Sequence, residues 1–259
     1  MNLIRDFRWM IAAATAVTLG ATAALAQPHD TLPPKHDDKP AAPAKEARAD
    51  DRIGDPYPLD NCPITGKKLG AMGDPVVKLY DGREVRFCCA GCAGKFEKDQ
   101  VANLAKIDEK LLKDQAPLYP LKASLVTGKD LPAKPYEFVC GNRLIRLGAE
   151  SEKADFLKDP KKHLVTLDKA VVAQQGKDYA LKVCPVSKEA FGGDMGEPVD
   201  LVIAGRLVRL CCKACKKDVE KDPAKFVAIV DAAQRTIKAK PEADHKPKDG
   251  RDDHKHGGG

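Results

Sequence analysis

The sequence predicts an α+β fold made of three small tandem units, each with a knuckle-like loop, a β-hairpin and a helix. The first observation is an internal repeat, whose copies span residues 57–108, 119–168 and 179–231. The second is a turn dipeptide between short alternating runs in each copy, which is typical of a hairpin. The third is the composition, with only 5% aromatic residues and nine cysteines. Small cores of this kind usually need metal ions or disulfides in addition to apolar burial.

The repeat is carried by anchor residues that recur in register in all three units. Each unit begins with a tyrosine, has two arginines after its turn, and closes its first helix with an aspartate. These anchors are Tyr57, Tyr119 and Tyr179; Arg83, Arg143 and Arg206; Arg86, Arg146 and Arg209; and Asp99, Asp159 and Asp222. A repeat with a fixed period indicates one structural motif used several times.

Each unit is expected to form a hairpin and then a helix. In unit one the strands cover 76–80 and 84–87, around the turn Asp81-Gly82; the other turns are Gly141-Asn142 and Ala204-Gly205. A helix should begin around residues 88–92 and carry Phe96 inward. A second, short amphipathic segment follows, at 101–107 in unit one and 227–229 in unit three. Short linkers over about 109–118 and 169–178, polar with some Leu and Val, are expected to join the units, either as separate segments or as extensions of the flanking helices.

The first 26 residues are predicted to be a secretory signal peptide. Arg5 and Arg8 form a basic start, an apolar run follows, and Ala24-Leu25-Ala26 matches a small-residue cleavage pattern. The alternative is an uncleaved membrane anchor, but Gly20 and several threonines make the run only weakly hydrophobic for a spanning helix. We therefore expect a periplasmic or secreted protein with no stable membrane span after cleavage of residues 1–26.

Polar segments flank the three units. Residues 27–56 are rich in Pro, Ala, Lys and Asp, and they are predicted to be a disordered spacer. Residues 232–259 are predicted to be a disordered, charged tail. In that tail His245, His254 and His256 can chelate a metal ion weakly, although a solvated tail with incidental histidines is the simpler alternative.

Eight cysteines form two matching sets, and these carry the chemistry of the sequence. A hairpin returns its end to its start, so the loop cysteine of each set should meet the cysteines at the start of the helix. There the helix dipole stabilises thiolates, the form that binds metals. The pattern predicts two sites for a soft or borderline ion, which is Cu(I), Zn(II) or a heavier thiophilic metal. The sets are Cys62, Cys88, Cys89 and Cys92 in unit one, and Cys184, Cys211, Cys212 and Cys215 in unit three.

Two questions about these sets stay open from sequence alone. Four sulfurs would close a tetrahedral site, but adjacent cysteines cannot easily both face one ion. A three-sulfur site in which Cys89 is a neighbour or a fourth ligand fits equally well. Structural disulfides are the other reading for an exported chain, yet cysteines so close in sequence close loops too short to constrain it.

Unit two serves as an internal control, because it keeps the repeat but lacks the sulfurs. Its residues at the four cysteine positions are Ser124, Gly148, Ala149 and Glu152. Its single cysteine, Cys140, lies on a hairpin strand and is expected to be a small buried hydrophobe. We interpret unit two as a degenerate spacer or interaction module.

The cysteine motifs bear a family resemblance. Cys62-Pro63, Phe87-Cys88-Cys89-x-x-Cys92 and Phe96 resemble the TRASH/YHS-like heavy-metal-binding domains, and unit three repeats the motif. The resemblance implies a small zinc-ribbon or treble-clef-like fold. It also implies metal ligands at Cys62, Cys88 and Cys92, and at Cys184, Cys211 and Cys215, with Cys89 and Cys212 additional to the minimal pattern. Such domains occur in proteins of metal sensing, trafficking and resistance.

Together these patterns favour an exported metal buffer, chaperone or scavenger, with metal ions and a metal-transport or resistance protein as its partners. The net charge of +6 is spread over many charges of both signs, so nucleic-acid binding is not expected. No phosphate-binding glycine loop or Ser/His/Asp pattern supports an enzyme. The alternatives are a non-catalytic interaction scaffold with structural metal or disulfides, and a thiol-redox protein that uses the Cys89-x-x-Cys92 spacing.

Overall fold

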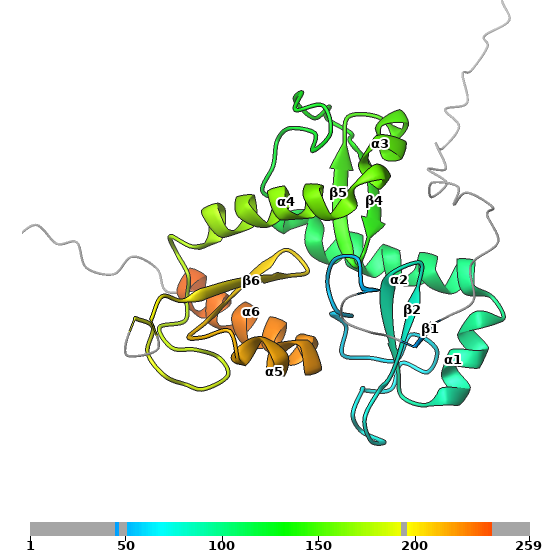
Figure 1. The fold of residues 1–259 in the computed structure, drawn as a ribbon, viewed down its shortest axis with the longest axis horizontal. Helices are drawn as coiled ribbons and strands as arrows, with labels where there is room; N and C mark the ends of the chain where they lie inside the picture. Colours follow the sequence, from blue (N-terminus) through cyan, green and yellow to red (C-terminus); the bar gives the residue numbers. More distant parts are fainter. Residues whose placement is uncertain (1–44, 47–50, 193–195, 240–259) are drawn as a thin grey trace, which may run out of the picture. The chain divides into compact units, whose positions relative to one another are not determined.

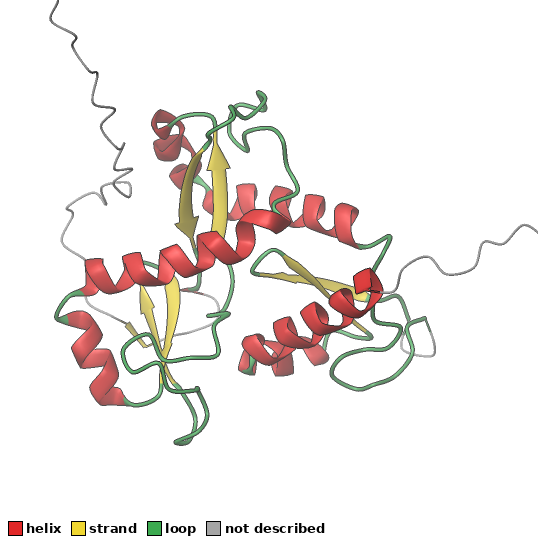
Figure 2. Cartoon of the chain, turned by 180° about the vertical axis from the view of Figure 1, so that it is seen from behind, coloured by secondary structure: helices red, strands yellow, loops and turns green. Residues whose placement is uncertain are grey.

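The computed structural model of the chain describes residues 45–46, 51–192 and 196–239, all within the compact body Lys39–Gly259. In these ranges β-hairpins alternate with helices (Figure 1). The α+β class predicted from the sequence is confirmed, with small antiparallel hairpins as its sheets. Figure 2 shows each hairpin, in yellow, together with red helices.

The three units have the same order of elements. In unit one, β2 (Val76–Tyr80) and β3 (Arg83–Phe87) precede α1 (Ala90–Glu97), α2 (Gln100–Gln115) and a 3-10 turn (Ala116–Leu118). In unit two, β4 (Tyr136–Cys140) and β5 (Arg143–Leu147) precede a 3-10 turn (Glu150–Glu152), α3 (Lys153–Lys158) and α4 (Pro160–Gln175). In unit three, β6 (Val199–Ile203) and β7 (Arg206–Leu210) precede α5 (Cys215–Lys221) and α6 (Pro223–Ala239). A short strand, β1 (Lys45–Glu46), pairs with β2.

The hairpin turns are the two-residue turns that the sequence predicts. Both central residues have positive φ in each turn, with values of 49° and 77° at Asp81-Gly82. This is the mirror-image turn whose twist matches that of the flanking strands, and Gly and Asp adopt it most readily. Strand register follows directly, because Tyr80 pairs with Arg83 and Val76 pairs with Phe87.

The second helix of each unit extends into the segment expected as a linker. Of the two alternatives for 109–118, the structure shows the helical extension, because α2 continues to Gln115 and is longer than the expected segment 101–107. Ile107 and Leu111 lie one turn apart and are both buried, so continuing the helix extends its apolar stripe against the core. For the same reason α4 runs through most of the expected linker 169–178 and buries Val171.

The structure also differs from the predicted boundaries of the flanking segments. Residues 232–239, assigned to the disordered tail, continue α6, and Gln234 donates a hydrogen bond to the carbonyl of Asp178 at 3.1 Å. Residues 51–56, assigned to the disordered spacer, join the fold. The N–H of Ile53 donates to the carbonyl of Gly82 at 2.8 Å. The predicted signal peptide and His245, His254 and His256 lie outside the described residues.

Each unit has its own small core under the hairpin. In unit one Phe87 of β3 meets Phe96 of α1 with ring centroids 5.2 Å apart, and Ile107 and Leu111 of α2 close the other side. Units two and three repeat this arrangement with Leu147 and Phe156, and with Leu210 and Val219. A small apolar cluster therefore stabilises the hairpin and helices of each unit.

A buried arginine in each unit forms an ion pair that joins the hairpin to the second helix. The arginine is the first residue of the second strand, and the aspartate lies on the long helix of the same unit. The pairs are Arg83–Asp108 at 2.5 Å, Arg143–Asp168 at 2.7 Å and Arg206–Asp231 at 2.8 Å. Since each arginine is buried and needs carboxylate partners to offset its charge, these arginine anchors of the sequence repeat are structural.

Glutamines at the ends of the long helices join successive units. The side chain of Gln115 donates to the carbonyl of Asn142 at 2.9 Å and accepts from the N–H of Leu144 at 3.0 Å. Gln175 makes the same two bonds to Gly205 and Leu207, at 2.8 and 2.9 Å. Units one and two thus each bind the hairpin turn of the unit that follows.

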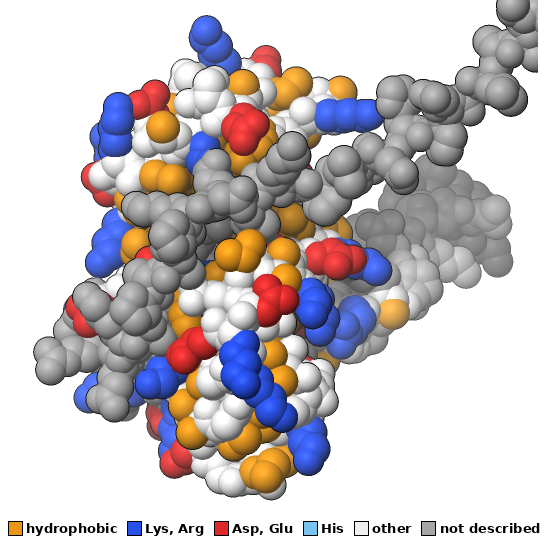
Figure 3. Space-filling view, turned by 90° about the vertical axis from the view of Figure 1, so that its right-hand side faces the viewer, with side chains coloured by type: hydrophobic (Ala, Val, Ile, Leu, Met, Phe, Trp, Pro, Cys, Tyr) orange, Lys and Arg blue, Asp and Glu red, His pale blue; other side chains and the backbone are white. Residues whose placement is uncertain are grey.

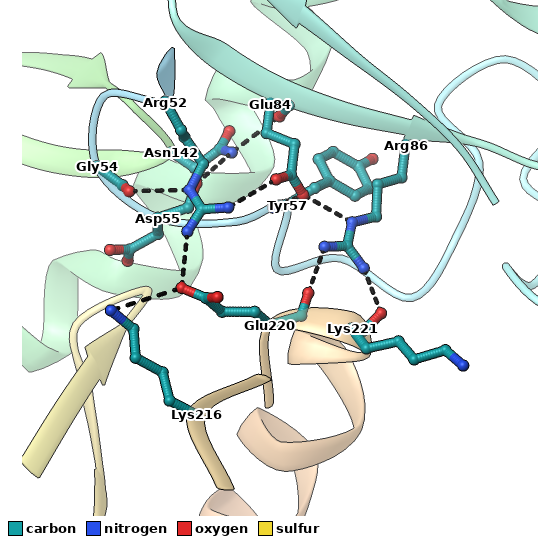
Figure 4. A network of polar contacts seen from close by, with 10 residues as sticks. All are labelled: Arg52, Gly54, Asp55, Tyr57, Glu84, Arg86, Asn142, Lys216, Glu220 and Lys221. Atoms are coloured by element: carbon teal, nitrogen blue, oxygen red, sulfur yellow. Dashed lines mark hydrogen bonds and ion pairs between the residues drawn. The ribbon is translucent and has the colours of Figure 1, made fainter. Parts of the chain in front are cut away.

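A polar network connects units one and three directly (Figure 4). The guanidinium of Arg86 donates to the carbonyls of Glu220 and Lys221, each at 2.6 Å, and to Glu84 at 2.7 Å. Arg52 lies between the carboxylates of Glu84 and Glu220 at 3.0 and 3.1 Å. Arg86 therefore caps the C-terminal end of α5 from the neighbouring unit.

Asp55 lies at the meeting point of units two and three. Its carboxylate accepts from the N–H of Ala204 at 2.5 Å and from Arg143 at 3.3 Å. Burial raises the pKa of Asp55 to about 6, although Arg143 and the Ala204 N–H oppose this shift. Asp55, which the sequence analysis placed in the spacer, is therefore buried and links units two and three.

The described surface carries charges of both signs. Figure 3 shows Lys and Arg side chains close to Asp and Glu side chains on one face, with apolar side chains between them. Among the helices that the structure describes, none combines the length and apolar character needed to cross a bilayer.

Candidate metal centres

In unit one, three buried sulfurs converge from three parts of the chain. Cys62 comes from the knuckle-like loop, Cys88 follows β3 and Cys92 lies in the first turn of α1. Their sulfur atoms all lie within 4.8 Å of one another, and those of Cys88 and Cys92 are 3.6 Å apart. We call these residues the first buried triad.

Local backbone structure explains why Cys62 reaches the helix start. The N–H of Gly66 donates to the carbonyl of Cys62 at 2.9 Å, and the N–H of Cys62 donates to Lys67 at 2.8 Å. Gly66 has a φ of 67°, which lets the chain reverse tightly there. Since β2 and β3 form a closed hairpin, the end of β3 returns Cys88 to the side of this loop.

Unit three builds the same arrangement as a second buried triad of Cys184, Cys211 and Cys215. The sulfur of Cys215 lies 3.9 Å from that of Cys184 and 3.7 Å from that of Cys211. Lys188 takes the place of the loop glycine, with a φ of 66°. The triads thus bring together the residues that the sequence predicted, from both copies of the motif.

The remaining two cysteines of the sets lie beside the triads. Cys89 is half-buried, and its sulfur is 3.5 Å from that of Cys92. Cys212 is also half-buried and lies 3.7 Å from Cys215. Neither belongs to the groups whose sulfurs are all within 4.8 Å of one another. The structure therefore gives each site three inner sulfurs and one at its edge.

Hydroxyl groups of the knuckle loops were missed by the sequence analysis. Thr65 Oγ1 lies 3.5 Å from the sulfur of Cys88, and Ser187 Oγ lies 3.3 Å from that of Cys211. Both residues stand three places after the loop cysteine, and unit two has Thr127 there. A hydroxyl residue recurs at this position in all three units, and this recurrence could have indicated its role in the sequence.

The loop cysteines are the most acidic members of the triads for which a shift is resolved. Burial raises the pKa of Cys62, but hydrogen bonds from the backbone of Cys88 and from Thr65 outweigh it and lower the pKa to about 6. The same balance at Cys184, with Cys211 and Ser187 as donors, lowers its pKa to about 7. A thiolate near neutral pH is ready to bind a cation without first losing a proton.

The helix cysteines have the opposite tendency in the metal-free protein. Burial and the neighbouring sulfurs raise the pKa of Cys92 to about 12 and also raise that of Cys215. The first thiolate of a triad disfavours a second, because their like charges lie close together. A bound cation would remove this penalty, so metal binding is expected to release protons.

The donor set fits a thiophilic ion. Each triad offers buried sulfur ligands and contains no carboxylate or imidazole, and such sets select soft or borderline metals. Metal–sulfur bonds of about 2.3 Å in tetrahedral geometry place sulfurs about 3.8 Å apart. The sulfur of Cys92 lies 3.6 Å from that of Cys88, and the sulfur of Cys215 lies 3.9 Å from that of Cys184, both close to that value. All nine cysteines are free, so no disulfide competes for these sulfurs.

Unit two replaces the triad with a hydrogen-bonded carboxylate. Ser124 donates to Glu152, which also accepts from Thr127 at 3.4 Å and from the N–H of Gly148 at 3.4 Å. A Cβ at Gly148 would lie 2.7 Å from the Glu152 carboxylate. Glycine at position 148 therefore leaves room for the Glu152 carboxylate, whereas the equivalent Cys88 of unit one places its own sulfur in the triad.

The other candidate residues play no part in the triads. Cys140 is buried in the core of unit two, as expected, and burial raises its pKa to about 11. His163 on α4 stacks on Phe156 with ring centroids 5.0 Å apart. The site chemistry of the described residues is thus concentrated in units one and three.

The chain was compared with known proteins, and the geometry of the two triads remains the basis for inferring its function. No protein-family model, no curated protein and no solved structure matches the chain.

Proposed function

We propose that this is an exported heavy-metal-binding protein, which uses two buried cysteine triads to buffer, carry or scavenge Cu(I), Zn(II) or a similar ion. The observation that carries the proposal is the convergence of three free, buried sulfurs in each of two units. Their spacing suits one ion per triad, and their chemistry suits a thiophilic one.

A cargo role is favoured over a purely structural one by the comparison with unit two. There the equivalent residues Ser124 and Glu152 are joined by a hydrogen bond, and the hairpin and helices have the same order without any sulfur ligand. The scaffold of the repeat therefore needs no metal in at least one of its copies. The sulfur ligands of units one and three would then serve a function, because the fold of the repeat does not need them.

The resemblance to TRASH/YHS-like domains extends this proposal. It would make units one and three zinc-ribbon or treble-clef-like metal modules, and it would place the protein near a metal-transport or resistance partner. The predicted signal peptide at 1–26 would place the mature chain in the periplasm or outside the cell. The chain would act by binding and release, not as an enzyme.

Metal content measured alongside free thiols tests the proposal. The mature chain, purified under reducing conditions, should carry two thiol-dependent ions, one for each triad. Cys62→Ser and Cys184→Ser should each remove one ion, and the double variant should remove both. Cys140→Ala is the matched control and should keep both. A parent protein without thiol-dependent metal would refute the proposed function.

A thiol-redox role is a second candidate, favoured by the 3.5 Å separation of the Cys89 and Cys92 sulfurs. A disulfide between them would be short-range and would remove Cys92 from the triad. Reduction of insulin disulfides by the metal-free protein would support this role, and its absence alongside metal binding would leave the metal proposal standing.

A further inference from the structure

Each buried triad has a fourth cysteine that differs from the other three in exposure. In unit one Cys62, Cys88 and Cys92 are 1%, 7% and 4% exposed, whereas Cys89 is half-buried. Unit three repeats the difference, since Cys212 is half-buried next to a buried triad. The same arrangement in two units points to a shared task for these outer cysteines.

We propose that Cys89 and Cys212 are transfer ligands, which pass the ion between a thiol-bearing carrier and the buried triads. This inference rests on the proposed metal-binding function and assigns separate roles to the sulfurs of each set. The triads hold the ion, and the outer cysteines form the route by which it enters and leaves.

Exposure separates the two adjacent cysteines. Cys89 has extended backbone, with φ −163° and ψ 164°, immediately before α1. Its side chain is half-buried and its sulfur lies 3.5 Å from that of Cys92, whereas Cys62 and Cys88 are buried. An incoming carrier therefore meets Cys89 before it meets Cys62 or Cys88.

Cys92 connects the outer and inner positions. Its sulfur lies 3.5 Å from that of Cys89 and 3.6 Å from that of Cys88. Both separations are close to the distance of about 3.8 Å between sulfurs that share one ion. An ion held first by Cys89 and Cys92 can therefore move inward by exchanging one sulfur, without leaving Cys92.

The exchange is a sequence of ligand substitutions with no change in the oxidation state of the metal. The bonds from the ion to the carrier break as bonds to Cys89 and Cys92 form, and the bond to Cys89 then breaks as Cys88 and Cys62 bind. Each cysteine thiol that binds gives up its proton, and each sulfur that leaves, first that of the carrier and then that of Cys89, takes one up. Release follows the same steps in reverse.

Unit two shows that cysteine is not required at this position by the fold. Ala149 stands there with φ −153° and ψ 160°, nearly the same backbone as Cys89. Changing the outer cysteines to alanine therefore reproduces a residue that the repeat already accommodates. The double variant Cys89→Ala/Cys212→Ala separates transfer from folding.

The test compares parent and double variant as full mature chains. Bound ions and affinity are measured by competition with a chromophoric Cu(I) chelator, and stopped-flow measures transfer of Cu(I) from a donor. The donor is glutathione in one arm and a Cys-x-x-Cys peptide in the other. Slowing in both arms supports a general thiol carrier, and slowing with the peptide alone supports a dithiol protein carrier.

The expected result is a split between affinity and rate. The double variant should keep two ions per chain. Its affinity should stay within about threefold of the parent, less than the loss of even an outer-shell partner usually causes. Its transfer rate should fall about tenfold or more. Cys140→Ala should match the parent in both measurements.

Two outcomes would overturn the inference. An affinity loss as large as that of Cys88→Ser would make Cys89 a resident ligand, and an unchanged transfer rate in both arms would make it a bystander. Failure of the parent to bind thiol-dependent metal is a different result, because it refutes the proposed function itself.

Discussion

Ser124 hydrogen-bonds to Glu152 in unit two, at the two positions that Cys62 and Cys92 occupy in unit one. One unit therefore closes its loop onto its helix start by a hydrogen bond, where its neighbours present sulfurs. The tandem repeat contains its own comparison between a polar contact and a candidate metal site on the same scaffold.

Metal removal should therefore loosen units one and three but not unit two. Chelation of the loaded protein should speed amide hydrogen exchange about 100-fold around β3 and β7, since binding energy stabilises the sites that ions occupy. Exchange in β5 should be unchanged because Glu152 is still in place. Equal loss of protection in all three hairpins would contradict the independence of unit two.

Loss of the carboxylate should destabilise unit two. Glu152→Ala leaves the buried Ser124 hydroxyl and the Gly148 N–H without their acceptor, which should cost about 1–3 kcal/mol in the free energy of unfolding. Urea unfolding of the protein measures this. Glu150→Ala, on an exposed neighbouring residue, is the control and should change stability by less than about 0.5 kcal/mol.

The scaffold of unit two should accept a metal site if the missing sulfurs are restored. Glu152→Cys removes the carboxylate that lies 2.7 Å from a Cβ at Gly148, and it thereby makes room for Gly148→Cys. Combined with Ser124→Cys, these changes should add one thiol-dependent ion per chain to the parent content. An unchanged metal content in a folded triple variant would show that the triads depend on more than the ligand positions.

Stability should depend on pH through Asp55. Its pKa is raised to about 6 from an ordinary value of 3.8 because burial disfavours the charged form. The stabilising effect of protonated Asp55 is complete below about pH 4 and is lost as the pH rises through about 6. The neighbouring charges that face Asp55 are Arg143, which favours its ionised form, and Asp168, which opposes it.

Asp55→Asn provides the measurement, because asparagine does not titrate. The difference in unfolding free energy between parent and variant should change by on the order of 3 kcal/mol between about pH 4 and 7, in the direction that favours the variant at higher pH. Urea unfolding at several pH values measures it. A difference that stays constant across this range would rule out the titration of Asp55.

The link between units one and three should depend on Arg86. Arg86→Gln leaves two carbonyls at the end of α5 without their donor and removes one donor from the buried carboxylate of Glu84, which keeps Arg52 and the N–H of Tyr57. This should cost about 1–3 kcal/mol in the free energy of unfolding. The equivalent Arg209 pairs with Asp200 at the surface, so Arg209→Gln should cost about 1 kcal/mol or less. Similar losses in the two variants would show that the inter-unit contact contributes little.

Much of the fold and site could be predicted from the sequence because it rests on local signals. The turn dipeptides set the hairpins, and the hairpins together with the spacing of Cys62, Cys88 and Cys92 bring the sulfurs together. The different exposure of Cys88 and Cys89 was harder to foresee. It depends on where the extended strand ends and α1 begins.

The contacts between units could not be read from the sequence in the same way. Asp55 lies in a polar stretch whose composition favours disorder, and its partners Arg143 and Ala204 are distant along the chain. Gln115 was placed in a linker because its neighbours are polar. Its role becomes evident only when α2 is seen to run on to the turn at Asn142.

The glutamine contacts give the chain a direction of growth. Gln115 and Gln175 each bind the hairpin turn of the next unit, while Lys238 stands at the corresponding position of unit three. A newly duplicated unit would bring with it both the turn that fits the preceding glutamine and the glutamine that receives its successor. The joint between successive units is therefore a transferable part of the repeat, whereas the contact of Arg86 with Glu220 and Lys221 ties this chain to its present order of three units.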